Sequence, residues 1–218
     1  MPQAFGRSAN TLAKLGVYGL FLGPVGLVTG LAEYNVSPWV TQAQVEQAQP
    51  VPFSHKHHVA GLGLDCRYCH TSVEDSSFAG IPPIKTCMTC HSQIWVNSPM
   101  LAPVRESFRT GRPVRWNRVY DLPDYVYFNH SAHIHAGVGC TDCHGRMDQM
   151  PLTRKVEPLN MGWCLDCHRQ PEMHVRPKEA VFAMDWDPPA NQRSAGQALL
   201  QANHVQVSRL TNCSVCHR

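Results

Sequence analysis

Every cysteine in this chain of 218 residues lies in the pattern Cys-x-x-Cys-His. This spacing is the attachment signature of c-type haem: the two thiols bond to the porphyrin, and the histidine reaches the iron as proximal ligand. The sequence therefore predicts five covalently bound haem c groups as cofactors. In chain order, the first to fifth motifs are Cys66, Cys69 and His70; Cys87, Cys90 and His91; Cys140, Cys143 and His144; Cys164, Cys167 and His168; and Cys213, Cys216 and His217.

Other uses of paired cysteines explain this pattern less well. A zinc site needs four nitrogen or sulfur ligands and gives no reason for a histidine after every second cysteine. A thioredoxin-like redox pair occurs once, beside a βαβ pattern, and a disulfide framework does not confine all cysteines to one local spacing. Haem attachment is the interpretation that accounts for all ten cysteines.

Two copies of the element Phe-x-His-x-x-His precede haem motifs. The first copy is Phe53, His55 and His58, and the second is Phe128, His130 and His133. On a helical turn, residues three apart project side by side, so the two histidines of one copy cannot bind one iron from opposite sides. We expect each copy to supply distal ligands to two different haems. His57 and His135 are then bystanders, facing solvent or haem propionates.

The histidine count does not determine which residue is the distal ligand of the fifth iron. Of the 13 histidines, five are proximal and four are the distal ligands just named. His204, nine residues before Cys213, is the first choice for the fifth distal ligand. Methionine ligation by Met150 or Met161, which raises the potential of a haem, and ligation by His174 are the alternatives.

The haem groups also determine the expected fold class. Haem faces replace part of the apolar core, so the chain can fold with little regular secondary structure, in agreement with 17 prolines and 15 glycines. We predict a multihaem cytochrome c with one N-terminal transmembrane helix and an irregular, short-helix, haem-cored extracytoplasmic domain. Haem propionates offset the formal charge of +3, so the charge does not indicate nucleic-acid binding.

Residues 15–32 carry no charge and are bounded by Lys14 and Glu33, which predicts a membrane-spanning helix. The run is longer than the apolar region of a usual signal peptide, and no small-x-small cleavage site follows it. We therefore expect an uncleaved single-pass anchor in the cytoplasmic membrane. Arg7 and Lys14 precede it, so the positive-inside rule places the N-terminus in the cytoplasm and the haem domain in the periplasm.

Glycines in this run recur in steps of three and four. That register places them on one helical face, where another transmembrane helix can approach closely. We expect this face to contact a partner membrane protein, although glycine is also simply common in membrane helices. Pro24 should bend the helix locally. The glycines of the face are Gly16, Gly19, Gly23, Gly26 and Gly30.

The repeat defines the expected organisation, because a second haem motif follows each copy. The connector between the modules carries arginines that could pair with haem propionates or face solvent: Arg105, Arg109, Arg112, Arg115 and Arg118. The expected segments are 1–14, cytoplasmic N-terminus; 15–33, anchor; 34–50, tether; 51–100, first dihaem module; 101–127, arginine and aromatic connector; 128–175, second dihaem module; and 176–218, a C-terminal segment with the fifth haem site.

The anchor, the two dihaem modules, the stretches "GIPPIKTCMTCH" and "EPLNMGWCLDCHR" and the terminal motif resemble the pentahaem cytochrome c subunit of bacterial alternative complex III. The modules also resemble class III multihaem cytochromes. The first resemblance implies a subunit of a quinol:electron-acceptor oxidoreductase. Its partners would be polytopic quinol-binding membrane subunits, an iron–sulfur subunit, a monohaem cytochrome c subunit and a soluble periplasmic electron acceptor.

Three functions follow as hypotheses. The chain has enough histidines to give every iron two axial ligands, which favours a non-catalytic electron-transfer subunit. A multihaem reductase would instead need one haem with an open distal position for substrate. A stand-alone membrane-anchored quinol dehydrogenase would oxidise quinol without partner subunits.

Overall fold

The computed structural model describes residue 6 and residues 8–217 of the chain, and it separates them into two compact units. One unit ends at Gln42, and the other begins at Ala43 and contains all five haem motifs. Arg7, on which part of the orientation argument rests, lies outside the described residues.

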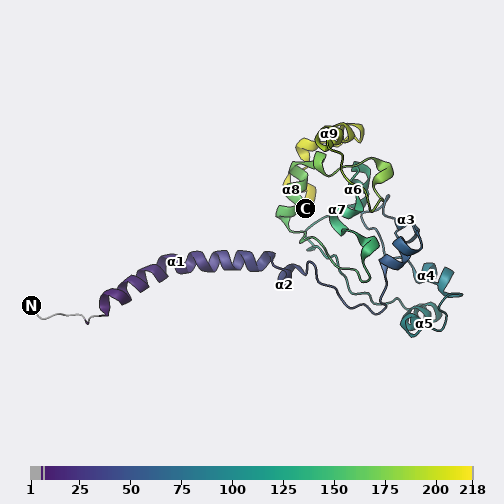
Figure 1. Cartoon of the computed structure of the whole chain (residues 1–218), viewed down its shortest axis with the longest axis horizontal. Coiled ribbons are helices and arrows are strands. Elements are labelled where there is room, and N and C mark those ends of the chain that lie inside the picture. The colour runs from purple at the N-terminus through teal and green to yellow at the C-terminus, as the bar shows by residue number, and fades with distance from the viewer. Residues whose placement is uncertain (1–5, 7, 218) are drawn as a thin grey trace, which may run out of the picture. The chain divides into compact units, whose positions relative to one another are not determined.

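The first unit is dominated by one long apolar helix, α1 (Ala9–Val36), followed by the single turn α2 (Pro38–Thr41). None of the residues of α1 is buried, and its length of 28 residues and mean hydropathy of 1.7 are sufficient to cross a membrane. The predicted apolar helix is therefore present, and it is a candidate membrane span. It continues through Pro24 and bends along its length in Figure 1, as a proline that lacks an amide hydrogen makes a helix do.

The second unit consists of short helices joined by long irregular segments (Figure 1). Between residues 43 and 217 no β-strand forms, and backbone pairing outside helices is limited to isolated bridges. The predicted irregular, short-helix architecture is confirmed. Its α-helices are α3 (Cys66–Cys69), α4 (Ile84–His91), α5 (Ala102–Thr110), α6 (His130–Ala136), α7 (Cys140–His144), α8 (Met161–Arg169), α9 (Gln192–Ala202) and α10 (Cys213–Cys216).

Shorter or differently wound turns complete the second unit. One is a π-helix, η1 (Lys56–Gly61). The others are the 3-10 turns η2 (Pro99–Leu101), η3 (Met147–Gln149), η4 (Pro171–Met173), η5 (Lys178–Ala180) and η6 (Val207–Arg209).

Few apolar side chains are buried in this unit. The main cluster consists of Val51, Leu101 and Val104, with Ile84 and Trp116 packed partly against it. A chain of this length normally buries well over half of the surface that its unfolded form exposes. A cluster this small is what we expect of a domain in which covalently attached porphyrins supply much of the apolar interior.

Candidate haem-binding sites

Each Cys-x-x-Cys-His motif lies on a short helix. The first, third and fifth motifs form α3, α7 and α10, and the second and fourth end α4 and α8. Cysteines three residues apart on a helical turn project from the same face, which is the arrangement that two bonds to one porphyrin require. None of the ten cysteines forms a disulfide bond.

The two copies of Phe-x-His-x-x-His adopt the same ring geometry. Phe53 meets His55 edge-on at 4.9 Å and 87° and stacks on His58 at 4.4 Å and 25°. Phe128 meets His130 edge-on at 4.8 Å and 89° and stacks on His133 at 4.5 Å and 26°. The phenylalanine thus fixes the angle between the two imidazoles of each copy, which is a role that the sequence pattern alone did not reveal.

The segment from the phenylalanine to the haem motif is one residue longer in the first copy, and the structure accommodates that extra residue within a helix. From the phenylalanine to the next cysteine there are 13 steps in the first copy and 12 in the second. The second copy forms an ordinary α-helix, α6, whereas the first winds as the π-helix η1. A π-turn accommodates one extra residue in a helix, so both copies can present their histidines in the same way.

Three of the predicted distal histidines lie close to predicted proximal ones. The ring centroids of His58 and His91 are 6.2 Å apart, those of His130 and His144 are 6.4 Å apart, and those of His133 and His168 are 6.1 Å apart. Two metal–imidazole bonds of about 2 Å and two ring radii of about 1.2 Å give about 6.4 Å between coaxial rings that share one metal. The three pairs therefore fit an iron bound between them.

His55 lies near the remaining proximal histidine of the first module. Burial, with smaller contributions from the neighbouring His70 and then His58, lowers the pKa of His55 to about 4. A histidine that stays neutral is the form that can bind a metal. His55 and His58 therefore turn toward different motifs, as do His130 and His133.

Hydrogen bonds orient almost all of these imidazoles. The Nδ1 atoms of His58, His70, His91, His130, His133, His168 and His217 lie 2.7–3.2 Å from backbone carbonyl oxygens. A carbonyl only accepts, so Nδ1 carries the proton and Nε2 keeps its lone pair. Hydrogen bonds of this kind fix the tautomer of metal-binding histidines. The tautomer, like the spacing of the rings, therefore fits these residues to haem iron.

The two predicted modules exchange such contacts. The Nδ1 atom of His55 lies 3.1 Å from Oγ1 of Thr153, which belongs to the second module. In the opposite direction, the Nδ1 atom of His130 donates to the carbonyl of Ser77, which belongs to the first. Each predicted module thus supplies a hydrogen-bond partner for the first histidine of the other module's Phe-x-His-x-x-His element. Both lie in one compact unit.

The cysteines show which motifs are neighbours. Burial raises the pKa of the Cys69 thiol, with a further rise from Cys87. Burial likewise raises the pKa of Cys140 to about 12, with a further rise from Cys66.

The third, fourth and fifth motifs are also neighbours in this order. Burial raises the pKa of Cys143 to about 12, with further rises from Asp142 and then from Cys167 and Cys164. Burial also raises the pKa of Cys164, with a further rise from Cys216. Consecutive neighbours therefore run from the second motif to the first, third, fourth and fifth. Cys90 and Cys213, in the two outermost motifs, are exposed.

The structure does not select a distal ligand for the fifth motif. The ring of His217 lies 5.8 Å from that of Tyr125, and among the described residues neither His204 nor His174 makes a ring contact with it. His204 is exposed and adopts a left-handed φ of 56°. Met150 is 2% exposed and Met161 is 67% exposed, so the two methionines lie in very different environments.

The remaining histidines of the repeat are exposed. His57 stacks on Trp95 with centroids 5.6 Å apart, and His135 lies on the exposed side of α6. Of the connector arginines, Arg109 pairs with Glu106 and Arg118 pairs with Asp121, both on the surface. Arg105 donates to the carbonyl of Ser98.

Tyr120, also from the connector, is closer to the candidate site. Its ring lies 4.3 Å from that of His144, and its hydroxyl lies 3.2 Å from the carbonyl oxygen of Arg154. Spacing gave no signal for this contact, because Tyr120 and His144 come from different segments.

Comparison with known proteins supports the haem interpretation. Residues 34–100 match the Class III cytochrome C family. That range contains the first Phe-x-His-x-x-His element and the first two motifs, and cytochromes of this class carry covalently bound haem c. The chain also resembles the multiheme cytochrome c subunit of menaquinone reductase from Nitratidesulfovibrio vulgaris, with 40% identity over 122 residues. The alignment covers 55% of this chain and 56% of the relative, so the chain spans about half the length of the curated protein it matches.

Proposed function

We propose that this chain is the electron-transfer subunit of a membrane quinol:acceptor oxidoreductase complex of the alternative complex III type. In this proposal five haem c groups relay electrons between the membrane subunits and a periplasmic acceptor. Haem c, when bound, supplies reversible one-electron transfer at its iron, with a potential set by its axial ligands and surroundings. The observation that carries the proposal is the spacing of 6.1–6.4 Å between facing histidine rings in three pairs.

The residues of the chain perform three tasks in this function. The cysteine pairs hold each porphyrin covalently on a short helix. In the three pairs, two histidines would hold each iron, which would leave no open site for a substrate at those haems and favours electron transfer over catalysis. The carbonyl bonds to Nδ1 keep the imidazole rings in place, so little reorganisation accompanies a change of redox state.

The succession of neighbouring motifs suggests a path. We infer that electrons travel along the second, first, third, fourth and fifth motifs, in either direction. Cys90 and Cys213 of the outermost motifs are exposed, and these ends can meet redox partners. Cys140 and Cys143 of the central motif are partly buried, so the middle of the path is less accessible to side reactions than its ends.

The named relative favours a second candidate. Because it is a subunit of a menaquinone reductase, the same five-site path could deliver electrons from a periplasmic donor to quinone in the membrane. The two candidates share the subunit role and differ in direction. Reduction of the haems by added menaquinol in the purified complex, against reduction of menaquinone by the pre-reduced complex, compares the two rates directly.

Carbon monoxide binding tests the subunit role itself. We expect the dithionite-reduced protein to bind less than one carbon monoxide per chain, and we expect its ferric form to show only low-spin signals in the electron paramagnetic resonance spectrum. A stoichiometric carbon monoxide complex together with a high-spin signal would identify an open haem and support the multihaem reductase instead.

A further inference from the structure

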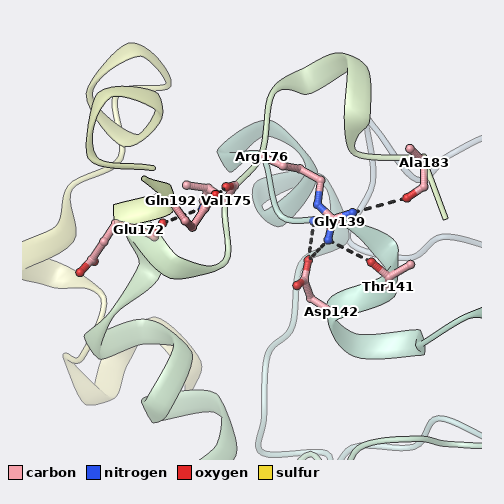
Figure 2. A network of polar contacts seen from close by, with 8 residues as sticks. All are labelled: Gly139, Thr141, Asp142, Glu172, Val175, Arg176, Ala183 and Gln192. Carbon is pink, nitrogen blue, oxygen red and sulfur yellow. Dashed lines mark hydrogen bonds and ion pairs between the residues drawn. The ribbon is translucent and has the colours of Figure 1, made fainter. Parts of the chain in front are cut away.

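One charged side chain is fully enclosed beside the third haem motif. The Arg176 side chain is 3% exposed, and its Nη2 atom donates to Oδ2 of Asp142 at 2.7 Å and to Oγ1 of Thr141 at 2.9 Å. Both acceptors lie inside the sequence that runs from Cys140 to His144. The guanidinium carbon also lies 4.5 Å above the ring of Trp186. Figure 2 shows the side chain reaching into α7 from the segment that follows η4.

Two glycines allow this approach. A Cβ added to Gly139 would come within 2.0 Å of the Arg176 guanidinium carbon. A Cβ added to Gly137 would come within 2.7 Å of the Arg176 carbonyl oxygen. The backbone amide of Arg176 donates to the Gly137 carbonyl at 2.8 Å. The loop before the third motif is therefore built around this arginine.

Helix α9 fixes the segment that carries Arg176. The buried side chain of Gln192 donates to the carbonyls of Glu172 and Val175, at 2.9 and 2.8 Å (Figure 2). Gly196 lets α9 approach the Glu172 backbone so closely that an added Cβ would lie 1.9 Å from its carbonyl oxygen. These contacts hold the guanidinium at one position relative to Cys140.

The Arg176 side chain is buried and Asp142 is only 25% exposed, so solvent screens the charges of this pair weakly. Solvent screens a surface ion pair, whereas a buried pair lies in a region of low dielectric where a charge acts on its neighbours strongly. The chain offers a direct contrast at the first motif, where Arg67 pairs with Asp65 and the two side chains are 49% and 47% exposed. The Nε atom of Arg176, in addition, is buried without a hydrogen-bond partner, so the pair is not arranged for maximal stability.

We propose that Arg176, held in place by Asp142, is a positioning residue that sets the reduction potential of the haem attached at Cys140 and Cys143. Reduction adds one electron to the iron, and a fixed buried cation favours that added negative charge, whereas a fixed carboxylate near the haem opposes it. This inference rests on the proposed function, because it requires haem at the third motif.

The test is a spectroscopically monitored redox titration, with dithionite as reductant, of the full-length haem-loaded protein and its variants. In Arg176→Met we expect one of the five midpoints to shift to lower potential, because Asp142 is then uncompensated. In Asp142→Asn we expect the same midpoint to shift upward. The double variant should return close to the wild-type value, a sign pattern that a merely structural role would not produce.

Two further variants make the titration decisive. Arg176→Lys keeps the charge and should leave the midpoint near the wild-type value. Arg67→Gln removes an exposed guanidinium beside the first motif and should shift any midpoint much less than Arg176→Met does. If Arg176→Met fails to accumulate with its haems, the upward shift in Asp142→Asn and the unchanged midpoint in Arg176→Lys carry the test.

The outcomes separate this inference from the function on which it rests. Five covalent haems in the wild type with unchanged midpoints in Arg176→Met and Asp142→Asn, or shifts of the same sign in both, would overturn the role of Arg176 alone. A wild-type chain that lacks haem at the third motif would overturn the proposed function as well.

Discussion

At the scale of single residues, the histidines of each repeat divide into two kinds. His55, His58, His130 and His133 face proximal histidines or are oriented through Nδ1, whereas His57 and His135 are exposed. The spacing of three predicted this division, because it follows from helical geometry alone. The hydrogen-bond partners of His55 and His130 could not be predicted from the sequence, because Thr153 and Ser77 come from the other predicted module.

Removing a distal histidine should open one haem. We expect His58→Ala to create a carbon monoxide site at the second motif, because its ring centroid lies 6.2 Å from that of His91. His57→Ala, one position away on the same turn, is the matched control and should create none. The carbon monoxide difference spectrum of the reduced variants measures this, and binding in the His57 variant but not in the His58 variant would refute the ligand assignment.

Tyr120 should contribute to stability through its hydroxyl. In Tyr120→Phe the ring can remain against His144, but the contacts of the hydroxyl with the backbone of Arg154 and Val156 are lost. We expect a loss of about 1–3 kcal/mol in the free energy of unfolding, the usual consequence of leaving buried polar groups without a partner. Thermal unfolding of the haem-loaded protein checks this. An unchanged melting temperature would show that water replaces the hydroxyl.

At the scale of elements, the sequence predicted the N-terminal apolar helix and the short helices more successfully than it predicted their details. The extra residue of the first repeat is visible in the sequence, but its accommodation as the π-helix η1 depends on packing. Gly137 and Gly139 lie just before the third motif in the sequence, and the structure shows that the second of them makes room for Arg176. That arginine lies more than thirty residues away in the sequence, so no local pattern could indicate the contact.

A methyl group at Gly139 should disrupt the third haem site. Because the added Cβ would overlap the guanidinium of Arg176, we expect Gly139→Ala to lower the yield of protein with all five haems attached. Gly61→Ala, at the end of η1 before the first motif, is the control: its added Cβ would lie no closer than 3.7 Å to other atoms. Intact-mass analysis of both variants counts the haems, and equal counts would contradict the packing argument.

At the scale of the whole molecule, the small apolar core and the exposed helix α1 both indicate that this chain acts with other components. Haem supplies the missing interior of the second unit, and a membrane with a partner helix would cover the first. Composition and spacing predicted the small apolar core and the apolar helix. They could not predict the succession of motifs, because it arises from contacts between residues far apart in the chain.

The glycine face of α1 should determine association with membrane subunits. An added Cβ at any of its five glycines meets no atom of this chain, so Gly23→Leu should leave the haem content unchanged. We expect it to weaken co-purification of partner subunits in mild detergent, because close helix approach needs small residues. Val28→Leu changes the opposite face and should retain the partners. Loss of partners in both variants would show that the glycine face has no special role.

The most direct test of the account is the reduction of haem by menaquinol, followed in the visible spectrum of the purified complex and of the isolated chain. We predict that the haems become reduced in the complex and stay oxidised in the isolated chain, since this subunit relays electrons and the quinol site belongs to its partners. Rapid reduction of the isolated chain would contradict the account and identify a stand-alone quinol dehydrogenase.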